Sequence, residues 1–126
     1  MPFALWSILL VSLLPLLWAL LSKVGTAYDN HQPRVGLAAA TGWRLRAYWA
    51  QQNAWEAFPS YAAAMLLAWM MKVPLFRLDL LAVVYLVLRL GHGLCYIADQ
   101  ASLRSLCWMG GYAMVVLLFV SAAGVV

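Results

Sequence analysis

The sequence predicts an all-α integral membrane protein, a single domain over residues 1–126 that forms a bundle of four transmembrane helices. Of its residues, 67% are apolar and only 10% are charged, whereas an average soluble domain has about 25% charged residues. So few charged side chains cannot cover a water-facing surface. Stretches 1–21 and 105–126 contain no Asp, Glu, Lys or Arg, and each is long enough to cross a bilayer as a helix.

We expect helices at about residues 3–22, 42–71, 77–98 and 103–125. In lipid every backbone polar group needs an internal partner, so only helices and closed barrels span a membrane, and no segment alternates as a barrel strand would. The connection at about 23–41 contains Gly, Asp, Asn and Pro and is expected to be a long loop. The other two connections, "KVPLFR" and "ADQAS", are expected to be short turns.

The basic residues predict the orientation in the membrane. One side carries five of them, namely Lys23, Arg34, Arg44, Arg46 and Arg104, whereas the other carries Lys72 and Arg77. Because the more basic side faces the cytoplasm, the long loop is expected there and both termini on the non-cytoplasmic side. In a bacterial cell the membrane would be the inner (plasma) membrane. The net charge is +4. Because the basic residues lie mostly at helix ends, where they set the orientation, this charge does not indicate a nucleic-acid partner.

The second expected helix begins with an unusually polar half. Residues 57–71 are too few to span, so the helix must extend backward through Glu56, Asn53 and Arg46. At about 100° per residue these three side chains lie within an arc of about 80°. The third helix has a matching stripe, because Tyr85, Arg89, His92 and Tyr96 follow one another at helical spacing.

Two opposite charges in these helices are expected at similar depth. A lone charge at the bilayer centre costs at least about 2.5–3.5 kcal/mol, so we predict a buried ion pair between Glu56 and Arg89. The two cysteines, Cys95 and Cys107, lack the spacing of metal ligands and are interpreted as apolar filler, and no metal site is expected.

Three motifs, in this order, resemble the MAPEG family of membrane-associated proteins in eicosanoid and glutathione metabolism. Arg46 is followed by "AQQNAWEAFP", similar to the family pattern AQxNxxExFP. The stretch "RLGHGLCY" resembles the R-x-x-H-x-x-x-Y of the family's prostaglandin synthases. The stretch "LRSLCW" resembles the Arg-Ser opening of the family's fourth helix, here Arg104 and Ser105.

This resemblance implies a homotrimer of four-helix subunits that binds glutathione between neighbours and acts on a lipophilic substrate from the lipid. Asn53 and Glu56 would hold the tripeptide, and His92 and Tyr96 would line the same site. Arg104 would face the sulfur, with Ser105 beside it. The implied function is a glutathione-dependent transferase or peroxidase that acts on lipophilic electrophiles, with glutathione as cosubstrate.

The chain also departs from the family pattern. Trp49 replaces an Arg that helps to hold a glutathione carboxylate in well-studied members, and Arg46 is one candidate for the missing cation. An alternative function is therefore a non-catalytic membrane protein of the same fold that binds a lipid or a small anionic ligand and modulates a partner. A third is an ion or proton pathway through Glu56, Arg89 and His92.

Overall fold

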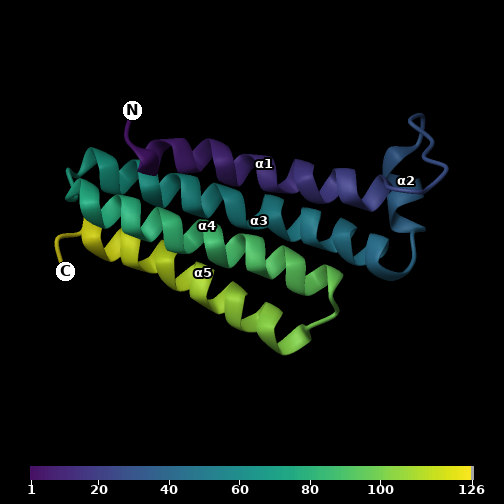
Figure 1. Cartoon of the computed structure of the whole chain (residues 1–126). Helices are drawn as coiled ribbons and strands as arrows, with labels where there is room; N and C mark the ends of the chain where they lie inside the picture. Colours follow the sequence, from purple (N-terminus) through teal and green to yellow (C-terminus); the bar gives the residue numbers. More distant parts are fainter. Residues whose placement is uncertain (126) are drawn as a thin grey trace.

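Four long helices lie side by side in the computed structural model, which describes residues 1–125 (Figure 1). They are α1 (Phe3–Lys23), α3 (Gly42–Met70), α4 (Leu75–Ile97) and α5 (Ala101–Ala122), and a short α2 (Pro33–Ala38) lies in the first connection. Both termini lie at one end of the molecule, and α2 lies at the other end, as does the α4–α5 turn (Figure 1).

The observed helices agree with the predicted ranges to within three residues. Two details differ. The loop at 23–41 contains α2, which begins with Pro33 at its first position, where a missing N–H costs nothing. The last helix ends at Ala122 instead of 125, because Gly124 adopts a left-handed conformation with a φ of 72°. The N–H of Val125 then bonds the carbonyl of Val120 and closes the helix.

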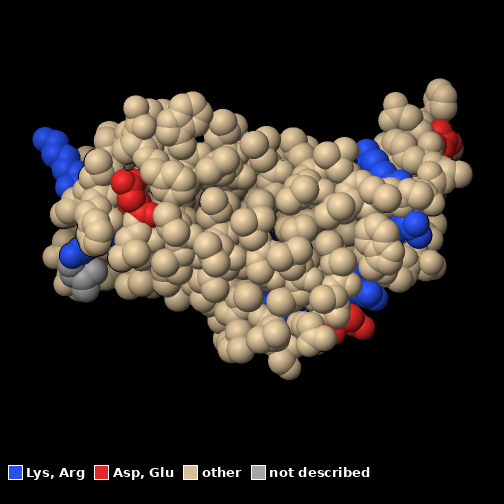
Figure 2. All heavy atoms as spheres, in the orientation of Figure 1, with Lys and Arg blue, Asp and Glu red and all other residues tan. Residues whose placement is uncertain are grey.

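Three helices, α1, α4 and α5, are long and apolar enough to cross a membrane by length and composition. Helix α3 has 29 residues, about 44 Å at 1.5 Å per residue, but its first half is polar, so its role as a fourth span stays a prediction. On the face in Figure 2, charged side chains gather at the two ends, and few reach the surface between them. This distribution fits an integral membrane protein.

Small side chains let the helices pack closely. Helix α3 buries a row of alanines, Ala47, Ala50, Ala54, Ala64 and Ala68. The ring of Trp18 on α1 packs with Ala50 and Ala54 and covers Gly93 on α4. Small residues at such positions allow close approach of helices in membranes, where van der Waals packing drives association. This packing places α3, α4 and α5 around the cavities described next.

Candidate functional site

A cavity of about 340 Å³ lies between α3, α4 and α5, toward the end that carries the α4–α5 turn. Five of the residues singled out in the sequence line it together with two others: Asn53, His92, Tyr96, Arg104, Ser105, Trp108 and Met109. Asn53 comes from α3, His92 and Tyr96 come from consecutive turns of α4, and the rest come from the first turns of α5. Polar residues from three helices therefore line the same cavity.

Arg104 and Tyr96 are in direct contact at the wall of this cavity. The guanidinium carbon of Arg104 lies 4.6 Å from the centre of the Tyr96 ring, in a cation–π contact. The Tyr96 ring in turn meets the His92 ring edge-on, with centroids 5.1 Å apart. His92 is buried, Tyr96 and Arg104 are half-buried, and Ser105 is exposed with its hydroxyl bonded to the carbonyl of Ala101 at 3.1 Å.

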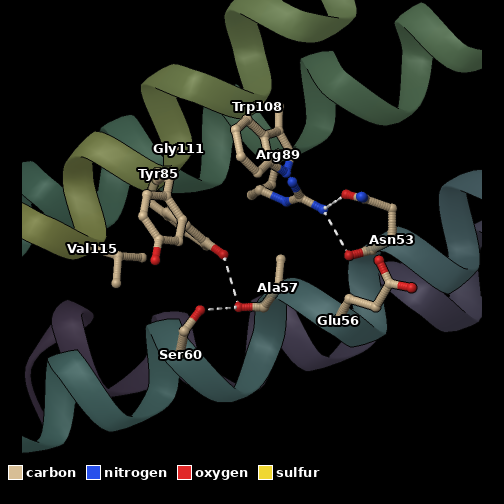
Figure 3. Close-up of a pocket in the computed structure, with 10 residues that line it drawn as sticks. Asn53, Glu56, Ala57, Ser60, Tyr85, Arg89, Trp108, Gly111 and Val115 are labelled. Atoms are coloured by element: carbon tan, nitrogen blue, oxygen red, sulfur yellow. Dashed lines mark hydrogen bonds between the residues drawn. The ribbon is translucent and has the colours of Figure 1, made fainter.

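Within residues 1–125 the structure shows no salt bridge between Glu56 and Arg89, so the predicted ion pair stays a prediction. Arg89, only 4% exposed, donates instead to the side-chain oxygen of Asn53 at 2.8 Å and to its backbone carbonyl at 3.2 Å (Figure 3). Glu56, three residues further along α3, is exposed.

A second cavity, of about 190 Å³, adjoins the first and shares Asn53 and Trp108 with it. It lies between the same three helices and is lined by Asn53, Glu56, Ala57, Ser60, Tyr85, Arg89, Trp108, Gly111, Tyr112 and Val115 (Figure 3). The Tyr85 hydroxyl donates to the carbonyl of Ala57 at 3.4 Å, as does Ser60 at 3.0 Å. This cavity leads from the polar residues toward the middle of the helices.

Trp108 is a lining residue that sequence reasoning missed. It follows Arg104 by four residues, so the two lie on one face of α5, and this spacing is the signal that could have identified it. Its ring stacks on Tyr112, with centroids 5.7 Å apart. Because Trp108 lines both cavities, it lies where the two adjoin.

Two other residues from the sequence analysis lie outside the lining of both cavities. Arg46 donates to the carbonyl of Ile97, with its Nη2 atom at 3.0 Å and its Nε atom at 3.3 Å. Ile97 is the last residue of α4, so Arg46 satisfies a terminal carbonyl that has no partner within the helix. Trp49 is 44% exposed on α3. Arg104 is therefore the cation of the larger cavity.

Comparison with known proteins agrees with the motifs and the arrangement of the helices. A family model described as "MAPEG family" matches residues 3–124. No curated protein and no solved structure matched the chain. The family match spans nearly the whole chain, from the start of α1 to the end of α5, and the protein belongs to the MAPEG family.

Proposed function

We propose that the protein is a membrane-bound, glutathione-dependent transferase or peroxidase that acts on lipophilic electrophiles. The observation that carries this proposal is the cavity in which Arg104 and Ser105 of α5 meet His92 and Tyr96 of α4. This cavity combines a cation with several hydrogen-bonding groups, which a charged thiol peptide requires. Its place in an apolar helical protein suits a second substrate that dissolves in the bilayer.

Arg104 is the proposed activator of the thiol. A free thiol has a pKa of about 8.5 and is mostly protonated at neutral pH, whereas the thiolate is the nucleophile. A guanidinium keeps its charge and favours the anion in a partly desolvated site. Within residues 1–125 the structure records a stacking contact of Arg104 with Tyr96 and no ion pair, so its charge is available to a sulfur anion.

The bound thiolate would react in one of two ways. With an electrophilic carbon, a carbon–sulfur bond forms and the leaving group departs with its electron pair. With a hydroperoxide, the thiolate takes one oxygen, the O–O bond breaks and an alcohol leaves. A second glutathione then attacks the oxidised sulfur, which gives glutathione disulfide and water.

The rest of the tripeptide would be held by α3. Because Arg89 is bonded to Asn53 and not to Glu56, the exposed carboxylate of Glu56 is available for the ammonium group of glutathione. In the proposed homotrimer a neighbouring subunit would close the open side of the site, and Arg46 or another basic residue near the first loop would meet a glutathione carboxylate. The site would then face the cytoplasm, with both termini on the other side of the membrane.

One observation favours a second function. Where well-studied relatives have an Arg, Trp49 presents an exposed aromatic ring and no positive charge. A site with fewer cations suits a lipid or a smaller anion, which would make the protein a non-catalytic binding protein that modulates a partner.

Turnover separates these two functions. The purified protein is incubated with glutathione and an electrophilic aryl halide, beside Arg104→Ala and the control Lys72→Ala, which removes an exposed cation in the α3–α4 turn. We expect Arg104→Ala to lower kcat/KM about 100-fold, the size of effect seen when one electrostatic stabiliser is lost, and Lys72→Ala to leave it unchanged. Binding of glutathione without transfer by the unaltered protein would favour the binding protein.

A further inference from the structure

Two thiols meet between α4 and α5 and do not line either cavity. Cys95 lies in the last turn of α4, and Cys107 lies in the second turn of α5. Both are free and half-buried, and their side chains are close enough to interact electrostatically. Packing alone does not require two cysteines at one contact, since any small apolar pair would fill the space.

The packing of the two helices explains why the sulfur atoms meet. Gly91 lies one turn before Cys95 on the same face of α4, and a Cβ atom placed on Gly91 would lie 3.4 Å from the sulfur of Cys107. One turn along, a Cβ atom on Gly110 of α5 would lie 3.0 Å from Leu88 of α4. The helices are therefore close here, and Cys107 packs against the surface of α4 formed by Gly91 and Cys95.

We propose that Cys95 and Cys107 are a redox-active pair that a hydroperoxide converts into a disulfide within one subunit. One thiolate attacks the hydroperoxide, an S–O bond forms, the O–O bond breaks, and an alcohol leaves with the proton. The second thiol then attacks the oxidised sulfur, an S–S bond forms, and water leaves. The two thiols lose two hydrogens in total, and the hydroperoxide is reduced to alcohol and water.

This disulfide would change the geometry of the larger cavity, which Tyr96 and Arg104 line. Cys95 directly precedes Tyr96, and Cys107 follows Arg104 by three residues, so the covalent bond would join the two backbones that carry the stacked pair. A disulfide requires Cα atoms about 4.4–6.8 Å apart, which fixes the spacing of α4 and α5 at this level. The spacing of Arg104 from Tyr96 would then depend on the redox state.

The cellular compartment predicts that the Cys95–Cys107 disulfide forms reversibly. The positive-inside rule predicts that the nearby α4–α5 turn faces the cytoplasm, where thiols are normally kept reduced and disulfides are transient. The resting state would be the dithiol seen in the structure. The proposal does not depend on glutathione binding to the larger cavity, because any small thiol or dithiol regenerates the reduced pair.

Intact mass measurement tests the pair directly. The full-length protein in detergent is treated with tert-butyl hydroperoxide, denatured, alkylated with N-ethylmaleimide and weighed, with and without prior dithiothreitol. We expect the oxidised protein to lose about 2 Da, the two hydrogens, and to take up no alkylating groups, whereas dithiothreitol restores uptake of two. A peptide that links Cys95 to Cys107 should be recovered from the oxidised sample.

Two matched variants complete the test. Cys95→Ser and Cys107→Ser each keep one thiol, so neither should show the 2 Da loss, and the remaining sulfur should gain oxygen atoms. Two alkylated thiols after oxidation of the unaltered protein would overturn the proposal. Oxygen added to each cysteine, or a disulfide between subunits on a non-reducing gel, would overturn it equally.

Discussion

At the scale of single residues, the burial of Arg89 decides how the polar half of α3 is used. A buried guanidinium needs acceptors, and Asn53 supplies two, one from its side chain and one from its backbone. Hydrogen bonds to charged groups are worth about 1.5–3 kcal/mol. The pairing therefore holds α3 to α4 beside both cavities, and it leaves Glu56 at the surface.

Asn53→Ala should lower the free energy of unfolding by about 1.5–3 kcal/mol, because Arg89 stays buried and loses its best acceptor. Glu56→Gln, the matched change at the surface, should alter it by no more than about 0.5 kcal/mol. Denaturant titration of both variants in detergent measures these differences. A larger loss for Glu56→Gln than for Asn53→Ala would show that the carboxylate, and not the amide, is the partner of Arg89.

The sequence selected five residues of the larger cavity, but it missed Trp108 and Met109 and did not give the contacts. Spacing along α4 placed His92 and Tyr96 on one face, whereas the family resemblance selected Arg104. The partner of Arg89 depends on the register of α4 against α3. Since Asn53 and Glu56 lie three residues apart on one face, a shift of less than one turn decides between them, and helical periodicity does not set that shift.

At the scale of the elements, one glycine sets the distance between α1 and α4. A Cβ atom on Gly93 would collide with the ring of Trp18, which is 2% exposed. Because Trp18 also packs with Ala50 and Ala54 of α3, its ring has no free space into which it can move. The close packing of α1, α3 and α4 therefore requires that position 93 has no side chain.

Gly93→Ala should lower the free energy of unfolding by about 1–3 kcal/mol, the usual cost of overpacking a filled core. Gly36→Ala on α2 is the control, since a Cβ atom there would meet nothing within 4 Å. Thermal unfolding of the two variants in the same detergent provides the comparison. Equal stability of Gly93→Ala and the unaltered protein would contradict the close contact.

Helix ends were less predictable than helix positions. Apolar runs and the turns between them located the four long helices, whereas the exact residue at which α3 and α4 end was not predicted. Lys72 and Asp99 adopt φ angles of 59° and 60°, a conformation that glycine favours and that ends a helix when it occurs. The short α2 was missed because six residues are too few to show a period.

At the scale of the whole molecule, the distribution of charge predicts how the protein sits in a membrane. The chain has two lysines, Lys23 at the end of α1 and Lys72 in the α3–α4 turn. The helix directions place these two residues at opposite ends of the molecule (Figure 1). The more basic end carries the first loop, and the positive-inside rule assigns it to the cytoplasm.

An amine reagent that does not cross membranes should therefore modify Lys72 on intact cells and leave Lys23 unmodified. Peptide mapping separates the two lysines from the N-terminal amine, and permeabilised cells serve as the control in which Lys23 also reacts. Modification of Lys23 alone on intact cells would reverse the proposed orientation. It would also place the larger cavity on the other side of the membrane.

Composition and hydropathy predict the membrane class, because this class follows from properties summed over many residues. The number of subunits depends instead on the fit between two exposed surfaces. The outward faces of these helices are apolar whether they meet lipid or a neighbour, as Trp55 and Leu106 illustrate, so the proposed trimer does not follow from hydropathy.

The central claim is that Arg104 holds glutathione as a thiolate, and the protons released on binding test it most directly. Isothermal titration calorimetry in two buffers of different ionisation enthalpy counts these protons, with S-methylglutathione as the control that has no thiol proton. At pH 7 a free thiol is mostly protonated. We expect the unaltered protein and Lys72→Ala to release about one proton per bound glutathione beyond the control, and Arg104→Ala to release far less. The same release from Arg104→Ala as from the unaltered protein, or none from either, would contradict the account.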